Sequence, residues 1–330
     1  MVDTNVNMAD LVAEVIEDSR EALDTGVNDV IVVEQSDGTF LSTPIVVQLG
    51  KFENFKTTFG SREDKVVTII VNGQVLVTND ALVLDDSGKA TFASRDDSIY
   101  IESQEWKDAN LNPGLNPGEF RVEKFDVVIK FNVFLYNQAD KLVLTDIDGT
   151  ITQSDLKGHI LPRFGLDADH ERVVEMFHMI GQNGYKIVYL TARSIAQGNR
   201  PNRLLTLIQG TREYLFQTLQ DQDGYSLPMG PVFLSLRTFI GGVIAEVTDP
   251  APMKLAMIKS IADLFNRKAE VFSGAYGNKE TDSRAYVQAG IDESNIFIVD
   301  TSSVLRRFSD GEITSYGDHE QQVDELYPKY

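Results

Sequence analysis

The 330-residue chain carries 50 acidic and 30 basic side chains, so its formal net charge is −20 at pH 7, and it contains no cysteine. Without a basic tract we expect no nucleic-acid partner, and without thiols the chain can form neither disulfides nor a thiolate metal site. No apolar run approaches the roughly 20 residues that span a bilayer, and no signal peptide opens the sequence, so we expect a cytoplasmic protein of about two domains.

The first 24 residues predict an amphipathic helix. Its apolar side chains recur at helical spacing, with acidic residues on the opposite face. They are Met8, Leu11, Val12, Val15, Ile16 and Leu23. Such a stripe fits either a helix packed on its own core or a helix on a membrane surface, and the acidic face weakens the membrane interpretation.

Residues 25–137 predict a β-rich domain. Short apolar runs are separated by turn signals such as Asp37-Gly38 and Ser87-Gly88, the spacing of an antiparallel, immunoglobulin-like β-sandwich. Asn72-Gly73 lies between two apolar runs and predicts a hairpin. A loop is expected over 110–118, and the β-rich run 120–136 is assigned to the sandwich because it precedes the first strand of the next domain.

From residue 138 onward, apolar strands alternate with helical patterns, which predicts a doubly wound α/β domain over 138–330. The helical patterns cover residues 168–182, 201–220, 252–265 and 282–290. The last residues, 309–330, are acidic and weakly patterned, and the sequence leaves their structure open.

The run Asp146-Ile147-Asp148-Gly149-Thr150 follows the apolar stretch 141–144. The two carboxylates are therefore expected at the carboxyl end of a buried strand, where open α/β sheets bind ligands. One of the two carboxylates can attack a phosphoryl group to form an aspartyl-phosphate while its neighbour transfers protons, which indicates phosphoryl transfer. Taken alone, the run also fits a turn or a fragment of a calcium site.

Three further segments follow in an order that favours a catalytic site. A second strand, 185–190, ends at Thr191; Lys254 lies near the start of a helix; and Asn278 and Asp282 follow a strand expected over 269–272. Each alone could be a helix cap or a surface residue, but their order resembles the motifs of the haloacid dehalogenase superfamily.

The roles follow from charge. A phosphate monoester brings about two negative charges to a site that already holds two carboxylates, so a cation is required. We expect Mg²⁺, which prefers oxygen ligands. The expected metal ligands are Asp146, Asp148 through its carbonyl, and Asn278 or Asp282. Thr191 and Lys254 are expected to bind the phosphoryl oxygens and assist catalysis.

Longer stretches resemble lipins, the Mg²⁺-dependent phosphatidic acid phosphatases. In the C-terminal half these are 146–155, 158–162, 183–186 and 227–231, and in the N-terminal half 28–35, 48–51 and 71–73. The resemblance implies hydrolysis of phosphatidic acid to diacylglycerol at a membrane surface, with peripheral attachment through residues 8–23. Thr191 stands where lipins more often show Ser, and Lys279 where they more often show Arg.

The segment 176–212 contains no acid and carries five basic residues, which fits either positive potential beside the phosphate site or a chance gap whose arginines pair with surface acids. We expect Arg193 to contact the head group of the substrate. Two alternatives remain: a soluble phosphatase of a small metabolite, and a noncatalytic module that binds phosphatidic acid. The presence of both Asp146 and Asp148 argues against the noncatalytic module.

Overall fold

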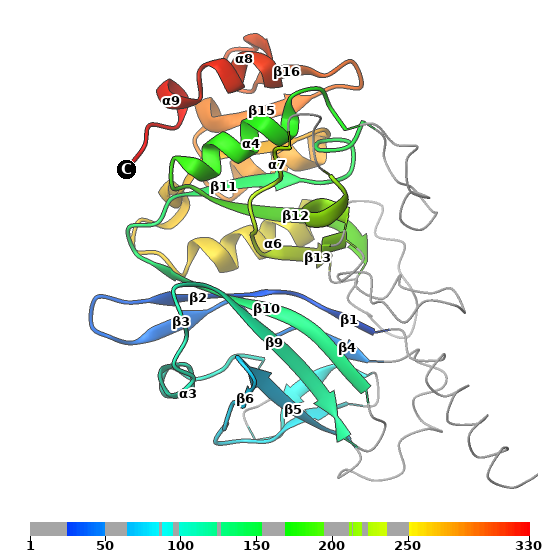
Figure 1. The fold of residues 1–330 in the computed structure, drawn as a ribbon, viewed down its shortest axis with the longest axis vertical. Helices are drawn as coiled ribbons and strands as arrows, with labels where there is room; N and C mark the ends of the chain where they lie inside the picture. The colour runs from blue at the N-terminus through cyan, green and yellow to red at the C-terminus, as the bar shows by residue number, and fades with distance from the viewer. Residues whose placement is uncertain are drawn as a thin grey trace, which may run out of the picture.

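The protein is a mixed α/β fold, as predicted. The computed structural model describes residues 25–49, 65–85, 88–94, 99–123, 127–153, 169–194, 211–212, 214–219, 224–235 and 251–330. An N-terminal β-sheet lies against a C-terminal sheet that is covered by helices (Figure 1). The helix predicted over 1–24 lies outside the described residues. Among the helices of the described segments, none has the length and apolar character needed to cross a bilayer.

The N-terminal sheet has eight strands in the order β3-β2-β10-β9-β5-β7-β8, with β6 paired to β5. The strands are β2 (Val30–Glu34), β3 (Phe40–Ser42), β5 (Val66–Val71), β6 (Gln74–Val75), β7 (Leu82–Leu84), β8 (Ala90–Phe92), β9 (Gly114–Val122) and β10 (Val127–Asn137), with helix α3 (Ser103–Asp108) beside them. The β2–β10 pair is parallel, and β1 (Thr25–Val27) pairs with β4 (Val47–Leu49) separately. This pairing shows a β-rich region but does not establish the immunoglobulin-like sandwich, which stays a prediction.

The hairpin predicted at Asn72-Gly73 is confirmed. These two residues connect β5 to β6, with φ angles of 52° and 76°. Two positive φ angles in a two-residue loop are typical of the type I′ turn, whose twist matches that of the flanking strands.

The loop predicted over 110–118 ends earlier than expected, because β9 already begins at Gly114. Pro117 lies within this strand opposite Asn132, whose backbone N–H donates to Asp29 instead of to β9. Pro117 therefore needs no N–H toward its partner strand. Gly118 is also required, because a Cβ there would lie 2.6 Å from the ring of Phe131. The Pro and Gly that suggested a loop are thus accommodated by the strand pairing.

The C-terminal sheet has seven strands in the order β13-β12-β11-β14-β15-β16-β17. They are β11 (Leu142–Asp146), β12 (Lys186–Ser194), β13 (Val232–Ser235), β14 (Phe272–Gly277), β15 (Ile296–Val299), β16 (Val304–Arg307) and β17 (Ile313–Ser315). The pairs among β11 to β15 are parallel, and the last two pairs are antiparallel.

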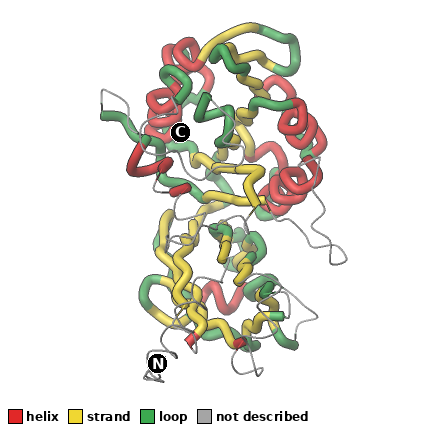
Figure 2. The backbone as a smooth tube through the Cα atoms, turned by 90° about the vertical axis from the view of Figure 1, so that its right-hand side faces the viewer, coloured by secondary structure: helices red, strands yellow, loops and turns green. Residues whose placement is uncertain are grey.

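Helices cover both faces of this sheet (Figure 2). They are α4 (Val173–Gln182), α6 (Ala251–Ala262) and α7 (Glu280–Gln288), with α8 (Tyr316–Gln321) and α9 (Val323–Leu326). Alternate strand residues enter different cores: Val143 shares one with α4, and Leu142 and Leu144 share the other with α6 and α7. This alternation is why β11 is buried on both faces, the pattern of a central parallel strand. Of the helix predicted over 201–220, most lies outside the described residues; 214–218 form a short π-helix, η3 (Tyr214–Thr218).

The strand expected over 269–272 was placed too early. Residues there form the 3₁₀ helix η4 (Lys268–Val271), and β14 follows over Phe272–Gly277. This strand contains several small residues, so it does not stand out as an apolar run. The small residues are needed because neighbouring side chains pack closely against the strand. A Cβ on Gly274 would lie 2.3 Å from the hydroxyl of Tyr327, and a Cβ on Gly277 would lie 2.5 Å from Cβ of Asp282. A second 3₁₀ helix, η5 (Glu293–Asn295), leads into β15.

The segment that the sequence left open, 309–330, is part of the core. It forms β17, α8 and α9, and the side chains of Tyr316 and Tyr327 are buried. Helices α8 and α9 contact α4, so the C-terminal residues cover one face of the second sheet.

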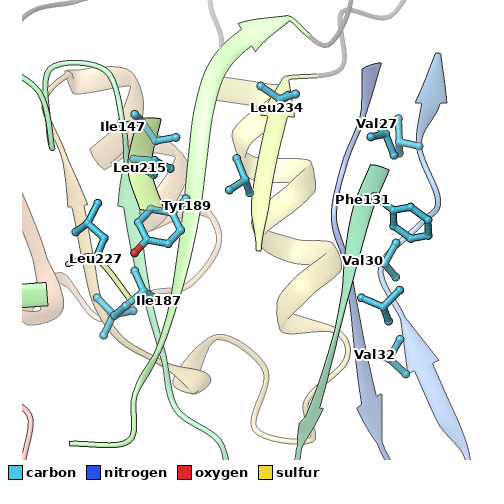
Figure 3. Packing of buried hydrophobic residues seen from close by; sticks show 14 of the residues in the cluster. Val27, Val30, Val32, Phe131, Ile147, Ile187, Tyr189, Leu215, Leu227 and Leu234 are labelled. Carbon is cyan, nitrogen blue, oxygen red and sulfur yellow. The ribbon is translucent and has the colours of Figure 1, made fainter. Parts of the chain in front are cut away.

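The two sheets share a core through α6, which lies between them in Figure 1. Ile31 and Val33 of β2, with Phe134 of β10, belong to the same buried cluster as Ile258 and Ile261 of α6. The opposite faces of β2 and β10 pack within the N-terminal sheet, where Val30, Val32 and Phe131 are seen in Figure 3.

Candidate active site

Three adjacent parallel strands bring the predicted residues to one edge of the C-terminal sheet. Asp146 is the last residue of β11, Thr191 lies near the end of β12, and Asp282 follows β14 in the first turn of α7. Lys254 reaches the same edge from the first turn of α6. The structure therefore brings together residues separated by up to 136 positions (282 − 146) in the chain.

Lys254 joins two carboxylates. Its Nζ donates to Oδ1 of Asp146 and to Oδ1 of Asp282, each at 2.5 Å. All three side chains are buried, with exposed fractions of 7% for Lys254, 4% for Asp146 and 1% for Asp282. Buried charges are tolerated only when they are paired and hydrogen-bonded, so this triad is mutually dependent.

Burial changes the protonation of the triad. Desolvation raises the pKa of Asp146 to about 7, because the attraction of Lys254 only partly offsets the burial and the repulsion of Asp282 and Asp148. Burial also opposes the charge on Lys254, but the two carboxylates outweigh it and raise the pKa of Lys254. Lys254 is therefore the fixed positive charge of the site, and further positive charge beside Asp146 would favour its ionised form at neutral pH.

Asp148 lies on the turn that follows β11 and is bound by Thr191. The Thr191 Oγ1 donates to Oδ2 of Asp148 at 2.8 Å, so the second carboxylate is held toward the end of β12. Gly149 has a φ of 84°, which permits the chain to turn back directly after the two acids. Asp148 is only partly buried, in contrast to Asp146, and the two acids therefore lie in different environments.

Two residues that the sequence did not single out hold this turn. The Nε2 of His170 lies 3.3 Å from the carbonyl oxygen of Gly149, and the Tyr316 hydroxyl donates to the carbonyl oxygen of Thr150 at 2.7 Å. Both side chains are fully buried. They come from distant parts of the chain, and no local pattern marks them.

The loop between β14 and α7 orients Asp282. The backbone N–H groups of Asn278 and Lys279 donate to Oδ2 of Asp282 at 3.1 and 3.0 Å. The Oδ1 of Asn278 is buried and has no hydrogen-bond partner. An orphaned amide oxygen beside an oriented carboxylate is a donor set that a hard cation would use.

Within the described part of the chain, no group of three or more Asp, Glu, His or Cys side chains has metal-binding geometry. Mg²⁺ does not require such a group, because it usually takes one or two carboxylates and keeps several waters. Two acids with the Asn278 amide oxygen and a backbone carbonyl remain compatible with it.

Two of the five basic side chains in the segment 176–212, Lys186 and Arg212, are described, and both pair with acids outside this site. Lys186 lies at the opposite end of β12, 3.7 Å from Asp140, and Arg212 is paired with the buried Asp29 of the N-terminal sheet. For these two residues the structure fits pairing with acids elsewhere on the molecule, and positive potential from the rest of the segment stays a prediction. The side chain of Arg193 lies outside the described residues, so its head-group contact stays a prediction.

Comparisons with known proteins match both halves of the chain. Residues 97–328 match the family described as LNS2 (Lipin/Ned1/Smp2), and residues 3–109 match the lipin N-terminal conserved region. The chain is 35% identical over 63% of its length to phosphatidate phosphatase LPIN3 of Mus musculus, and 32% identical over 70% to phosphatidate phosphatase LPIN1 of Homo sapiens. It is 33% identical over 62% of its length to phosphatidic acid phosphohydrolase 1 of Saccharomyces cerevisiae. The aligned region covers about a quarter of each of these relatives.

Proposed function

The chain belongs to the LNS2 (Lipin/Ned1/Smp2) family, as its motifs indicated, and from this premise we propose that it hydrolyses phosphatidic acid to diacylglycerol and phosphate. The observation that supports the proposal most directly is the position of Asp146 at a strand end, paired with Lys254, beside Asp148. Relatives named as phosphatidate phosphatases supply the substrate class.

In the proposed mechanism Asp146 attacks phosphorus, and the bond to the diacylglycerol oxygen breaks. Asp148 donates a proton to that departing oxygen, then takes a proton from the water that hydrolyses the aspartyl-phosphate. Lys254 holds Asp146 in position and places positive charge beside the phosphoryl oxygens. Thr191, which donates to Asp148 in the free protein, is placed to donate to a phosphoryl oxygen when substrate is bound.

We assign a Mg²⁺ site to the same edge of the sheet. Asp146, the carbonyl of Asp148, and Asn278 or Asp282 would hold the ion, and the orphaned Oδ1 of Asn278 supports this assignment. When bound, the ion supplies charge that neutralises the phosphoryl oxygens and favours the ionised form of Asp146. We expect Asn278→Leu to weaken binding of Mn²⁺, a spectroscopic substitute for Mg²⁺, without changing the fold.

Two further assignments belong to this proposal. We place the protein in the cytoplasm, attached peripherally to a membrane surface through residues 8–23, because a lipid substrate must be reached at an interface and this segment has an apolar stripe. We also assign an immunoglobulin-like arrangement to the N-terminal strands and a haloacid dehalogenase-like fold to the C-terminal domain.

The test measures phosphate release from phosphatidic acid in mixed micelles and from a panel of soluble phosphate esters, with Mg²⁺ and with EDTA. We expect release from phosphatidic acid that EDTA abolishes and Mg²⁺ restores, and no release by Asp146→Asn. Much faster turnover of a sugar phosphate would identify a metabolite phosphatase instead. Binding of phosphatidic acid without release would identify a noncatalytic module, and full activity in EDTA would remove the metal from the mechanism.

A further inference from the structure

Strand β13 is the outermost strand at one side of the C-terminal sheet, and two residues of the N-terminal region bind its outer side. Asn28 and Asp29 lie between β1 and β2, and both are buried. The Oδ1 of Asn28 accepts from the N–H of Leu234 at 2.8 Å, and its Nδ2 donates to the carbonyl oxygen of Leu234 at 3.2 Å. Asp29 accepts from the N–H of Val232 at 2.9 Å, and its own N–H donates to the Val232 carbonyl oxygen at 3.3 Å.

These four hydrogen bonds replace those of a neighbouring strand. The N–H and C=O of alternate strand residues point to the same side, and in β13 the outward-facing residues are Val232 and Leu234. Buried backbone groups without partners are costly, so the free edge of β13 needs such a neighbour. Asn28 is suited to this task because one side-chain amide offers both an acceptor and a donor.

The contact lies directly opposite a site residue. Leu234 pairs in register with Thr191 of β12, and the register shifts immediately after Thr191. In Figure 3, Leu234 lies on the strand between the one that carries Tyr189 and the strands that carry Val27 and Val30. The outer side of the Leu234 backbone is thus bound by Asn28. On its inner side Leu234 pairs with Thr191, the last regular pair before the register shift, and the Thr191 hydroxyl binds Asp148.

We propose that Asn28 is a positioning residue for the phosphatase reaction: it fixes the backbone of Leu234, and through β13 it fixes the Thr191 hydroxyl against Asp148 and the phosphoryl group. This inference rests on the proposed function for the reaction, but its geometric part concerns the free protein. Asn28 acts through Thr191 and contacts no reacting atom.

Other contacts also join the N-terminal and C-terminal regions. A role of Asn28 in positioning Leu234 can therefore be distinguished from a role in holding the two regions together. Gln35 accepts from Gln138 at 3.0 Å and donates to the carbonyl oxygen of Leu264 at 3.1 Å, just beyond the C-terminal end of α6. The buried pair of Asp29 and Arg212 adds a third link. Loss of Asn28 therefore leaves the parts attached and removes only the support of Leu234.

The experiment is a double-mutant cycle between Asn28→Ala and Thr191→Val, with p-nitrophenyl phosphate as the soluble substrate. We expect Thr191→Val to lower kcat by about 100-fold, as loss of one preorganised donor does, and Asn28→Ala to lower it by roughly tenfold. The double variant should be no slower than Thr191→Val alone, because Asn28 has nothing left to position. Asn28→Asp keeps the shape and the acceptor for the Leu234 N–H, so its kcat should lie between those of the wild type and Asn28→Ala.

Gln138→Ala is the matched control, since it removes an equivalent contact between the same two parts far from Thr191. We expect its kcat within about twofold of the wild type in either background. Amide hydrogen exchange measures the hydrogen bond between the Leu234 N–H and Asn28 without substrate. The Leu234 amide should exchange at least about tenfold faster in Asn28→Ala, at a rate between those of the wild type and Asn28→Ala in Asn28→Asp, and at the wild-type rate in Gln138→Ala.

Additive losses of kcat in the cycle would overturn the proposal, as would an unchanged Leu234 exchange rate in both Asn28 variants. Equal losses in Gln138→Ala and Asn28→Ala would reduce Asn28 to one attachment among several. If the wild type cleaves p-nitrophenyl phosphate but not phosphatidic acid, the substrate assignment fails while the cycle still decides the role of Asn28. A wild type inactive on both esters overturns the proposed function, and the positioning role with it.

Discussion

The buried histidine of α8 predicts a specific dependence of stability on pH. The Nδ1 of His319 lies 3.1 Å from the hydroxyl of Tyr276, and its ring packs edge-on against Phe297 with centroids 4.5 Å apart. Its exposed fraction is 4%. Burial lowers the pKa of His319 to about 4; Asp318 opposes this shift and Arg307 adds to it.

The sign follows from proton binding. An unfolded histidine has a pKa of about 6.5, so below that pH the unfolded chain binds a proton that the folded protein excludes. His319 therefore destabilises the fold as the pH falls from about 6.5 toward 4. Linkage with these two pKa values gives a loss of about 2 kcal/mol between pH 7 and pH 5, and about 3 kcal/mol by pH 4.

The assay is urea unfolding of the wild type and of His319→Asn at pH 7, 6 and 5. Asn can accept the Tyr276 hydroxyl proton but does not titrate, so the difference between the two proteins isolates His319 from the other acids and histidines. We expect the variant to be the less stable protein at pH 7 and to recover about 2 kcal/mol relative to the wild type by pH 5. A stability difference that stays constant over this range would refute the reasoning, because it would show that His319 takes up its proton equally in the folded and unfolded states.

Three further predictions concern the site and the membrane. Asp146→Asn and Asp148→Asn should each abolish phosphate release while far-UV circular dichroism is unchanged, and the double variant should be little worse, because the two acids act as one unit; more than about a tenth of the wild-type rate in Asp146→Asn would exclude the covalent intermediate. Tyr316→Phe should lower the free energy of unfolding by about 1 to 2 kcal/mol and kcat several-fold, since it leaves the carbonyl of Thr150 without its donor; unaltered kcat would show that the turn keeps its geometry without that hydroxyl. Deletion of residues 1–24 should reduce liposome sedimentation and activity on vesicles but spare activity on p-nitrophenyl phosphate; parallel loss of both activities and of thermal stability would make this segment a core element.

The residues of the site that the sequence predicted are those whose positions follow from local patterns. Asp146 follows a continuous apolar run and is the last residue of β11, so this strand end could be read directly. Thr191 follows another apolar run, but β12 continues beyond it to Ser194. Because the strands are parallel and adjacent, their ends necessarily meet at one edge. Lys254 was found because it lies near the start of the helical pattern over 252–265. The start of β14 was predicted too early, but Asp282 still follows this strand in the structure.

The residues that the sequence missed act across long separations. His170 and Tyr316 hold carbonyl groups of the turn after β11, and Asn28 binds a strand 206 positions away. Their hydrogen bonds go to backbone groups. Every residue has such groups, so no sequence pattern identifies the partner. Small residues misled the prediction for a different reason: Gly274 and Gly118 suggest flexible chain, but each is a place where a neighbouring side chain packs against the backbone of a strand.

The charges at the site are the physical reason for proposing a metal ion in the reaction. Asp146, Asp148 and Asp282 contribute three negative charges when ionised, and Lys254 contributes one positive charge, so the four side chains carry −3 + 1 = −2. A phosphate monoester adds about two more negative charges. Burial has already raised the pKa of Asp146 to about 7, so the approach of such an anion would favour the protonated, non-nucleophilic form of this residue. Lys254 cannot reverse this, because its charge is shared between Asp146 and Asp282. A divalent cation held by the oxygens of this edge would bring the site close to neutrality before substrate arrives, and we propose the buried, unpartnered oxygen of Asn278 as one of its ligands.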